Sequence, residues 1–265
     1  MAERTHNADA KSVFRQETLT VNGIKTVVLT GGRGDPLVFF HGGGVFHGFD
    51  FAAPWTERFT VYIPFHPGFG DSGDDPEIVD MHDYVLHNLE LFDQLKLERG
   101  VRLVGFSLGG WMAAELAMEH RRRLHKLVLV APAGLRDKEH PGADIFRIPP
   151  EQMPSYLVHD MQVIARHLPK EPDPDFLAAR YREMTTIARI AWEHPFSHRL
   201  PRWLHRISVP TLLVWGEQDR LLPYQQAQTW AKLIPGAKVQ TFRDAGHLVL
   251  DERADAVKAV GDFLA

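Results

Sequence analysis

Residues 101–110 read Val-Arg-Leu-Val-Gly-Phe-Ser-Leu-Gly-Gly, which places a mainly apolar run directly before a glycine-rich turn. A run of this kind is typical of a strand that is buried on both faces. Met112 and Leu116 then follow at helical spacing, so we expect a helix from about Gly110. A serine in such a strand-to-helix turn has a strained backbone and a raised hydroxyl, which makes Ser107 a candidate nucleophile. Taken alone, the pattern also fits a glycine-rich turn with an incidental serine.

Similar apolar runs recur along the chain, at residues 37–40, 59–63, 126–131 and 211–215, and a further strand is predicted at 238–242. Segments with apolar residues at helical spacing lie between or after them, among them 81–95 and 257–263. Strands that alternate with helices in this way predict an α/β fold with a doubly wound, mostly parallel sheet.

Two further strands are predicted ahead of these runs, at residues 14–21 and 24–30. Asn22-Gly23 lies between them, and this pair tolerates positive φ at both turn positions, so we expect a two-residue hairpin. Residues 31–36 follow as a turn. Their Arg-Gly-Asp letters are interpreted as part of that loop and not as an integrin ligand.

Residues 136–205 interrupt the alternation of strands and helices. They are rich in proline, histidine and arginine, with helical pieces near 151–168 and 174–192 and no visible pair of strands. We interpret this segment as a helical cap that is inserted into the sheet domain and lies over it. The α/β core is accordingly predicted to comprise residues 1–135 and 206–265.

Composition excludes several classes of partner and site. The 265 residues are 44% hydrophobic and 24% charged, and their net charge of −4 gives no indication of a nucleic-acid or anionic-membrane partner. Without cysteine the chain forms no disulfide, thiolate metal site or cysteine nucleophile. Residues 1–12 are polar, as in a disordered arm, and neither a secretory signal nor a membrane-length apolar run is evident. These features favour a cytoplasmic location.

His247 and Asp219 are the candidate base and acid that would act with Ser107. His247 lies in Ala-Gly-His-Leu after one predicted strand, and Asp219 lies in Trp-Gly-Glu-Gln-Asp after another. Both follow the carboxyl ends of strands, the edge at which parallel sheets form their sites. The chain order serine, aspartate, histidine is the order expected for a triad on such a sheet. Glu217 stays open as an alternative to Asp219.

A second glycine-rich turn, His41-Gly42-Gly43-Gly44, follows the predicted strand at 37–40. Glycine lets a backbone N–H approach a ligand closely, because no Cβ stands in the way. We expect the Gly43 N–H, with Gly44 beside it, to pair with the Leu108 N–H in binding a developing oxyanion. His41 is expected to hold this loop. A plain turn at the end of a strand is the alternative for the whole segment.

Together these motifs resemble the α/β-hydrolase superfamily, in the type that carries a helical cap. The likeness runs from about residue 14 to 265 and includes Phe65-His66-Pro67-Gly68-Phe69-Gly70-Asp71-Ser72 and Val209-Pro210-Thr211. The resemblance implies that Ser107 is the nucleophile, His247 the base and Asp219 the acid that orients it. It also implies that residues 136–205 are the cap. The family usually has an aspartate where Phe65 stands here, which affects the polar network beside the site and not the three residues themselves.

Other motifs carry less weight. Residues 68–73 match the Gly-x-Gly-x-x-Gly pattern of dinucleotide-binding turns, but the acidic residues crowded there would repel a pyrophosphate. His194 and His198 have the spacing of a metal-binding pair, but Pro195 breaks the helix between them. The basic run at 120–123 is interpreted as a solvated helix end. We therefore expect neither a cofactor nor a metal.

The expected activity is that of a serine hydrolase that forms an acyl-enzyme on Ser107 and cleaves small to medium hydrophobic carboxylic esters. Substrate-binding residues are expected in the cap and beside the triad, and the candidates are Gly44, Phe106, Phe146, Met153, Tyr156, Leu157, Met161, Trp192 and Leu248. The expected partner is a small-molecule ester or related acyl compound, bound by a monomer or homodimer, with no nucleic acid and no membrane.

Two alternative functions stay open. A carbon–carbon bond hydrolase of the meta-cleavage product type shares the fold and triad, but Phe106 and Leu248 stand where that group usually has Asn and Trp. A non-catalytic receptor could use the same fold to bind a ligand. Dehalogenases and epoxide hydrolases with an aspartate nucleophile are disfavoured, because residue 107 is serine.

Overall fold

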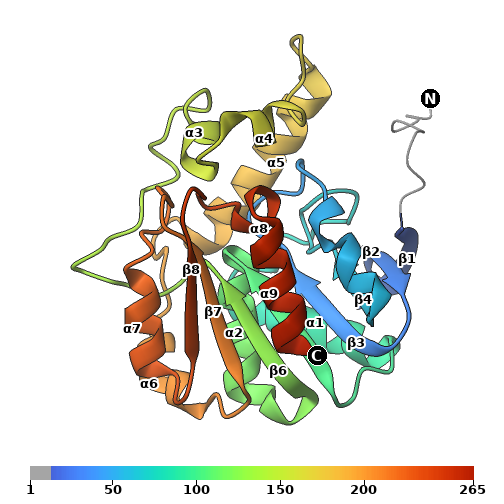
Figure 1. Ribbon diagram of the computed structural model, residues 1–265. Helices are drawn as coiled ribbons and strands as arrows, with labels where there is room; N and C mark the ends of the chain where they lie inside the picture. Colours follow the sequence, from blue (N-terminus) through green and yellow to red (C-terminus); the bar gives the residue numbers. More distant parts are fainter. Residues whose placement is uncertain (1–12) are drawn as a thin grey trace.

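The computed structural model describes residues 13–265, and the arm expected at residues 1–12 lies outside the described residues. The strands are β1 (Arg15–Val21), β2 (Ile24–Gly32), β3 (Asp35–Phe40), β4 (Phe59–Pro64), β5 (Val101–Phe106), β6 (Leu124–Val130), β7 (Thr211–Gly216) and β8 (Lys238–Phe242). They form one sheet of eight strands in the order β1-β2-β4-β3-β5-β6-β7-β8 (Figure 1). β2 is antiparallel to both its neighbours, and all pairs from β4 to β8 are parallel. The predicted mostly parallel sheet is confirmed.

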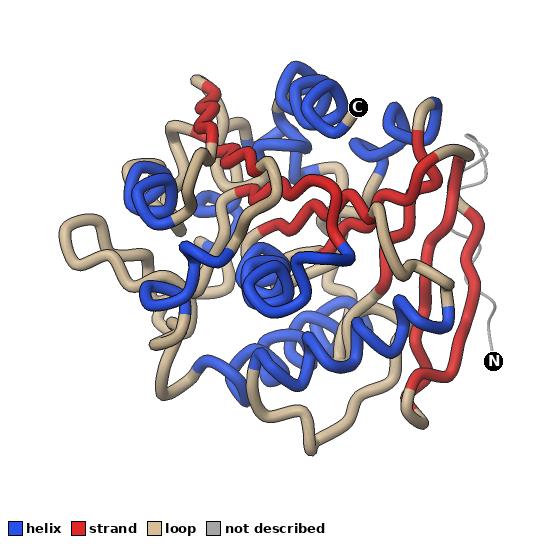
Figure 2. The backbone as a smooth tube through the Cα atoms, turned by 90° about the horizontal axis from the view of Figure 1, so that it is seen from below, coloured by secondary structure: helices blue, strands red, loops and turns tan. Residues whose placement is uncertain are grey.

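Helices cover both faces of this sheet. The α-helices are α1 (Met81–Gln94), α2 (Leu108–His120), α3 (Met153–Leu157), α4 (Met161–Ala165), α5 (Pro174–Ala191), α6 (Leu200–Trp203), α7 (Gln226–Leu233), α8 (Val249–Glu252) and α9 (Ala254–Leu264). The 3-10 helices are η1 (Asp50–Glu57), η2 (Arg121–Arg123) and η3 (Leu204–Arg206). α1 and α2 pack together on one face, whereas α9 and η1 lie on the other (Figure 2). The fold is therefore doubly wound, as expected.

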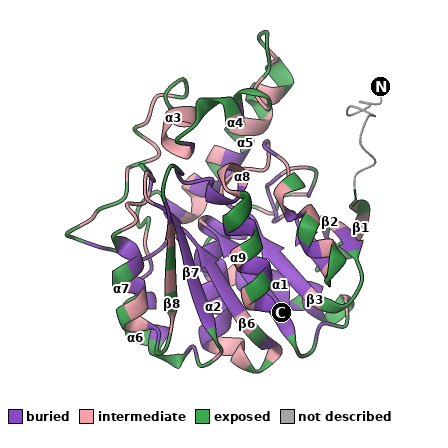
Figure 3. Cartoon of the chain, viewed as in Figure 1, coloured by how far each residue is buried: buried purple, intermediate pink, exposed green. Residues whose placement is uncertain are grey.

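The core lies between the central strands and these helices, as the buried ribbon in Figure 3 shows. Every residue of β5 and β7 is buried, and most of their side chains are apolar on both faces of the sheet. Strand β8 at the edge alternates between exposed and less exposed residues. The unbroken apolar runs in the sequence thus correspond to the centre of the sheet.

The predicted hairpin is confirmed, because Asn22 and Gly23 have φ of 47° and 79° and join β1 to β2. The turn that follows is shorter than the expected 31–36. Gly31 and Gly32 continue β2, since β2 pairs with β4 as far as Gly32, and β3 already begins at Asp35. This pairing across the sheet is not evident from the local sequence.

The inserted helical segment lies between β6 and β7 and holds α3 to α6. Helices α3, α4 and α5 lie above the carboxyl ends of the strands, whereas α6 lies at the opposite end of the sheet (Figure 1). Its helix α5 is capped by Asp173, whose carboxylate accepts hydrogen bonds from the N–H groups of Asp175 and Phe176. The helix expected near 151–168 is present as two short helices, α3 and α4. The helix is interrupted between α3 and α4, where the Asp160 side chain caps α4 by accepting a hydrogen bond from the Gln162 N–H.

A parallel bridge between Gly134 and Phe196 connects the two ends of this segment, which the sequence did not reveal. The start of helix α2 also differs from expectation. It begins at Leu108, two residues before the expected Gly110, because the turn at Ser107 is tighter than the apolar spacing suggests.

Among the buried histidines, three have a pKa below the ordinary value. His41 lies in the loop after β3, His66 in the loop after β4, and His87 on α1. Burial lowers the pKa of His41 to about 3 and that of His87 to about 4. Burial and the neighbouring His41 and His87 hold the pKa of His66 well below its ordinary value. All three imidazoles are therefore neutral in the folded protein at pH 7.

Because these three histidines are neutral in the folded state, we expect the free energy of unfolding to fall as the pH is lowered. In the unfolded chain an imidazole takes up a proton near pH 6.5, so below that pH the unfolded state binds more protons than the folded state. Each histidine should then lower the free energy of unfolding by up to about 1.4 kcal/mol per pH unit. Denaturant unfolding between about pH 7.5 and pH 5 measures this slope.

His87→Gln is expected to reduce the slope of the free energy of unfolding against pH by the contribution of one bound proton. His125→Gln, which replaces an exposed histidine, should leave this slope unchanged. A free energy of unfolding that is constant over this pH range would contradict the prediction.

Candidate active site

Ser107 joins β5 to α2 in a strained conformation, with φ of 52° and ψ of −114°. Three hydrogen bonds hold its main chain. The Ser107 N–H donates to the Val130 carbonyl at 2.9 Å, and the Ser107 carbonyl accepts from Trp111 at 3.1 Å and from Ala133 at 2.9 Å. A non-glycine residue with positive φ persists only where its surroundings over-determine it, and such residues cluster at functional sites.

The glycines of the Gly105–Gly109 turn allow close crossing of backbones. A Cβ built on Gly109 would lie 2.2 Å from the Phe40 carbonyl oxygen, and one built on Gly105 would lie 2.4 Å from the Gly109 carbonyl oxygen. No side chain fits at either position. Helix α2 therefore starts directly against the end of β3, where the second glycine-rich loop begins.

The structure brings the three predicted side chains together from three separate turns. His247 Nε2 lies 2.9 Å from Ser107 Oγ, and His247 Nδ1 lies 2.8 Å from Asp219 Oδ2. Since a carboxylate only accepts, Nδ1 carries the imidazole proton and Nε2 is free to accept from the serine hydroxyl. The side chains of His247 and Asp219 are almost fully buried, at 3% and 0% exposed. This arrangement can transfer the hydroxyl proton to the imidazole.

Asp219 is fixed by its own turn. Its Oδ1 accepts hydrogen bonds from the Leu221 N–H at 2.9 Å and the Leu222 N–H at 2.8 Å, which leaves Oδ2 for the imidazole. The alternative acid, Glu217, accepts from the Thr241 hydroxyl at 2.9 Å and lies 3.8 Å from Arg243. The structure therefore pairs His247 with Asp219 and not with Glu217.

The loop His41–Gly44 lies against the serine. A Cβ built on Gly42 would lie 3.2 Å from Ser107 Cβ, so this loop passes within van der Waals distance of the serine. His41 holds the loop in place, because its Nδ1–H donates to the Gly42 carbonyl at 2.7 Å and its Nε2 accepts from the His66 N–H at 3.0 Å. The N–H of Leu108, at the first position of α2, is one of those that a helix start leaves without a helical partner.

Helix α5 packs onto the same loop, and its contacts were missed by sequence reasoning. The methyl Cδ1 of Ile187 lies 2.7 Å from a Cβ built on Gly43, so Ile187 covers the loop next to the serine. Gly44 faces the carboxylate of Glu183 and the guanidinium of Arg180, which pair at 2.9 Å. The only signal in the sequence is the helical spacing of the buried residues Glu183, Thr186, Ile187 and Ala191.

Glu183 is a buried carboxylate that supports two loops at once. Burial raises the pKa of Glu183, whereas the guanidinium of Arg180 and hydrogen bonds from the N–H groups of Gly70 and Val45 lower it.

Phe65 occupies the place where the resemblance leads one to expect an aspartate, and its ring packs against Phe49, with 5.7 Å between the ring centres. Apolar packing thus replaces a polar group on this side of the site.

The expected substrate-binding residues are only partly gathered near the serine. The Phe106 ring lies 4.9 Å from the His247 ring, and Leu248 is buried, with 3% of its surface exposed. The expected inward positions of Met161 and Trp192 are wrong, because these side chains are 45% and 66% exposed. Met161 is the first residue of α4, in which only Ile164 is buried, and Trp192 directly follows the last residue of α5.

Four other expected cap residues lie within the inserted segment at intermediate burial, and these are Phe146, Met153, Tyr156 and Leu157. Phe146 packs on Trp192 at 5.0 Å, and Tyr156 lies under the guanidinium of Arg220 at 4.4 Å. Leu157 touches the site through its main chain, because its carbonyl accepts from the Leu248 N–H at 2.8 Å.

Two further properties of the described chain bear on the site. A hollow bordered by Phe106 and Leu248 has a volume of about 10 Å³, so it holds no more than about one water molecule. Within residues 13–265, His, Asp and Glu side chains do not gather in a group of three or more that could hold a metal ion. None of the helices in this range is long and apolar enough to cross a membrane.

Comparisons with known proteins identify the family and the fold of the chain. The family model described as the alpha/beta hydrolase family matches residues 37–260. The chain is 28% identical to 2-hydroxymuconate semialdehyde hydrolase of a Pseudomonas species (strain CF600), over 98% of this chain and 97% of that protein. It is also 28% identical to Lipase 1 of Psychrobacter immobilis, over 96% of this chain and 86% of the lipase.

Solved structures show the same fold. The meta-cleavage product hydrolase from Pseudomonas fluorescens IP01 superposes with a TM-score of 0.78 at 21% identity, covering 93% of this chain and 96% of that one. Hydrolase activity is supported by the family and by these relatives, whose substrates differ from one another. From the residues that meet at the sheet edge and the family model that spans most of the sequence, the chain belongs to the alpha/beta hydrolase family.

Proposed function

We propose that the protein is a serine hydrolase that cleaves small to medium hydrophobic carboxylic esters. The observation that carries this proposal is the pair of hydrogen bonds from Ser107 through His247 to Asp219, 2.9 Å and 2.8 Å long. Nucleophile, base and orienting acid in this geometry are the requirements for acyl transfer. Roles for these residues come from this geometry and from the family to which the chain belongs.

In the proposed reaction the Ser107 hydroxyl attacks the ester carbonyl as His247 Nε2 takes its proton, and Asp219 stabilises the resulting imidazolium. The N–H groups of Leu108 and Gly43 bind the oxyanion, each contributing on the order of 3 kcal/mol in such sites. His247 then protonates the leaving alcohol. A water molecule, deprotonated by the same imidazole, hydrolyses the acyl-enzyme and returns the serine.

The inserted segment at residues 136–205 is proposed to act as a cap that selects the substrate. Ile187 reaches the oxyanion loop from α5, while Phe106 and Leu248 flank the imidazole from the core. These side chains are apolar, which favours an uncharged, hydrophobic acyl group. The partner is therefore a small molecule, and the protein needs no bound cofactor for this reaction.

A carbon–carbon bond hydrolase is the second candidate, because several relatives carry that activity in their names. One is the 2-hydroxymuconate semialdehyde hydrolase, and another is a 2-hydroxy-6-oxo-6-phenylhexa-2,4-dienoate hydrolase of Burkholderia cepacia, 26% identical over 88% of this chain. The apolar Phe106 and Leu248 beside the triad favour esters. Faster turnover of dienone acids than of simple esters would reverse this order.

Ser107→Ala should abolish the hydrolysis of p-nitrophenyl acetate and butyrate, with a loss of at least about 10⁴-fold in kcat. The reason is that the attacking oxygen is removed while the fold is kept, so thermal unfolding should change little. A fluorophosphonate should label the wild-type protein at residue 107 and leave the variant unlabelled. Retained ester hydrolysis by the variant would end the assignment of the nucleophile.

Asp219→Asn should lower kcat by about 10⁴-fold, because the amide no longer holds the imidazole in the tautomer that accepts from serine. Glu217→Gln is the matched control. It removes a carboxylate from the same turn, but that carboxylate binds the Thr241 hydroxyl and not His247. Ester hydrolysis by both variants is measured at equal concentrations. A larger loss in Glu217→Gln than in Asp219→Asn would show that the acid is misassigned.

Ile187→Val should widen the range of acyl groups, because it removes the methyl group that lies over Gly43. We expect kcat/KM for a branched ester, relative to acetate, to rise by about tenfold, the effect of one methylene in an apolar pocket. The free energy of unfolding should fall by only about 1 kcal/mol. Ile190→Val on the same helix serves as the control. If Ile187→Val leaves the ratio of kcat/KM for the branched ester to that for acetate unchanged, the acyl group does not bind next to Ile187.

A further inference from the structure

The loop that carries His247 is attached to the inserted segment on both sides of the histidine. After it, the Leu248 N–H donates to the Leu157 carbonyl at 2.8 Å. Before it, a Cβ built on Gly246 would lie 2.8 Å from the main-chain nitrogen of His159. The turn between α3 and α4 therefore packs backbone against backbone on the loop that positions the base.

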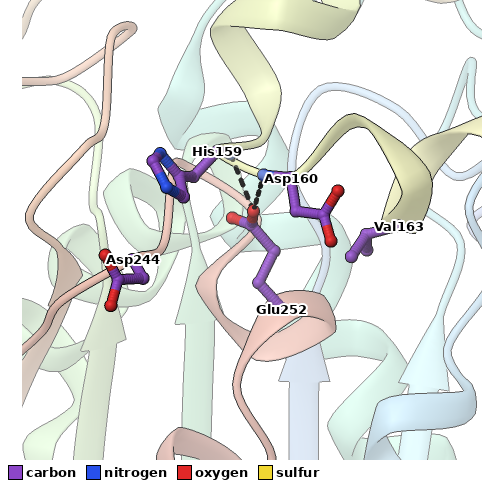
Figure 4. A pocket seen from close by; sticks show the side chains of 5 residues that line it. All are labelled: His159, Asp160, Val163, Asp244 and Glu252. Carbon is purple, nitrogen blue, oxygen red and sulfur yellow. Dashed lines mark hydrogen bonds between the residues drawn. The ribbon is translucent and has the colours of Figure 1, made fainter.

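Glu252 completes this contact with one carboxylate. Its Oε1 accepts hydrogen bonds from the N–H groups of His159 and Asp160, both at 2.7 Å, as Figure 4 shows. Its Oε2 accepts from the Gly246 N–H at 2.6 Å. Helix α8, which carries Glu252, directly follows the His247 loop. A single side chain thus connects the α3–α4 turn (residues 157–160) to the residue before His247.

These bonds belong to a strong class. Hydrogen bonds between an ionised carboxylate and N–H groups are roughly twice as strong as those between neutral groups. Burial raises the pKa of Glu252, and the three N–H donors oppose that effect. The short lengths of 2.6 Å and 2.7 Å fit charge-assisted bonds.

The neighbouring residue on α8 makes a second connection of the same kind. Asp251 Oδ1 lies 3.1 Å from His47 Nδ1, and these side chains are only 8% and 6% exposed. His47 belongs to the loop that continues from Gly44. The two acidic residues of α8 therefore contact two different parts of the site. Asp251 contacts the loop that continues from His41–Gly44, and Glu252 contacts the inserted segment.

We propose that Glu252 is a positioning residue, which aligns the His247 imidazole with Ser107 by tying the Gly246 main chain to the α3–α4 turn. The inference rests on the proposed function and adds to it a dependence of the base on the inserted segment. A displacement of about 1 Å in a reacting group can cost about 10²-fold in rate. Loss of the carboxylate should therefore affect the chemical step more than substrate binding.

The test is Glu252→Gln, measured by ester hydrolysis with p-nitrophenyl butyrate. The amide has the same size, but its NH₂ group faces an N–H donor where an acceptor oxygen stood. We expect kcat per active site to fall by about 10- to 100-fold, while KM changes by less than about threefold. Active sites are counted by end-point labelling with a fluorophosphonate, so a role confined to folding stability would not change this value.

Two further variants make the test specific. A surface hollow is lined by Glu252 and Asp244 together with His159, Asp160 and Val163 (Figure 4). Asp244→Asn removes the other carboxylate of this hollow, and it should leave kcat per active site within about twofold of wild type. Gly246→Ala keeps Glu252 but places a Cβ against the α3–α4 turn, and it should lower kcat as Glu252→Gln does.

The inference is overturned if kcat per active site in Glu252→Gln or Gly246→Ala stays near wild type, or if only KM rises. An equal loss in Asp244→Asn would also overturn it, because the charge of the hollow and not the tie to Gly246 would then be responsible. A wild-type protein that neither hydrolyses esters nor is labelled at Ser107 would overturn the proposed function itself, a result distinct from all of these.

Discussion

The positive φ of Ser107 is the constraint on which the rest of the site depends. A non-glycine residue in such a conformation costs about 1–3 kcal/mol. The cost is offset by the buried strand before it, the helix after it and the three hydrogen bonds that hold its main chain. Without side chains at Gly105 and Gly109, helix α2 can begin close enough to β3 to leave the serine hydroxyl at the sheet edge, facing His247.

Most of the fold follows from local patterns that the sequence displays openly. Apolar runs without alternation mark the central strands, and Asn22-Gly23 marks the hairpin, because each pattern reflects the burial or φ of the residues concerned. The candidate site residues could also be named, since Ser107, Asp219 and His247 each follow the end of a strand, and parallel strands gather such ends at one edge. The structure places the three within hydrogen-bond distance.

The inserted segment could not be predicted at the same level. Helical spacing shows which residues share a face but not what that face meets, which is why Trp192 was expected inside and is exposed. Its decisive contacts come instead from Glu183, a charged residue that the spacing alone does not assign to a role, and from Ile187. Glu252 escaped notice for a similar reason, because its partners are backbone N–H groups of residues distant in sequence.

Helix α5 illustrates how far the insertion is built into the core. Glu183 accepts hydrogen bonds from the Val45 and Gly70 N–H groups, Arg189 forms a bidentate pair with Asp74, and Ile187 rests on Gly43. Such an insertion is no interchangeable module. Transfer of this segment alone into a relative would leave the Glu183 carboxylate and the Arg189 guanidinium without these partners. The loop that contains Gly43 and the loop that contains Gly70 would therefore have to be transferred with it.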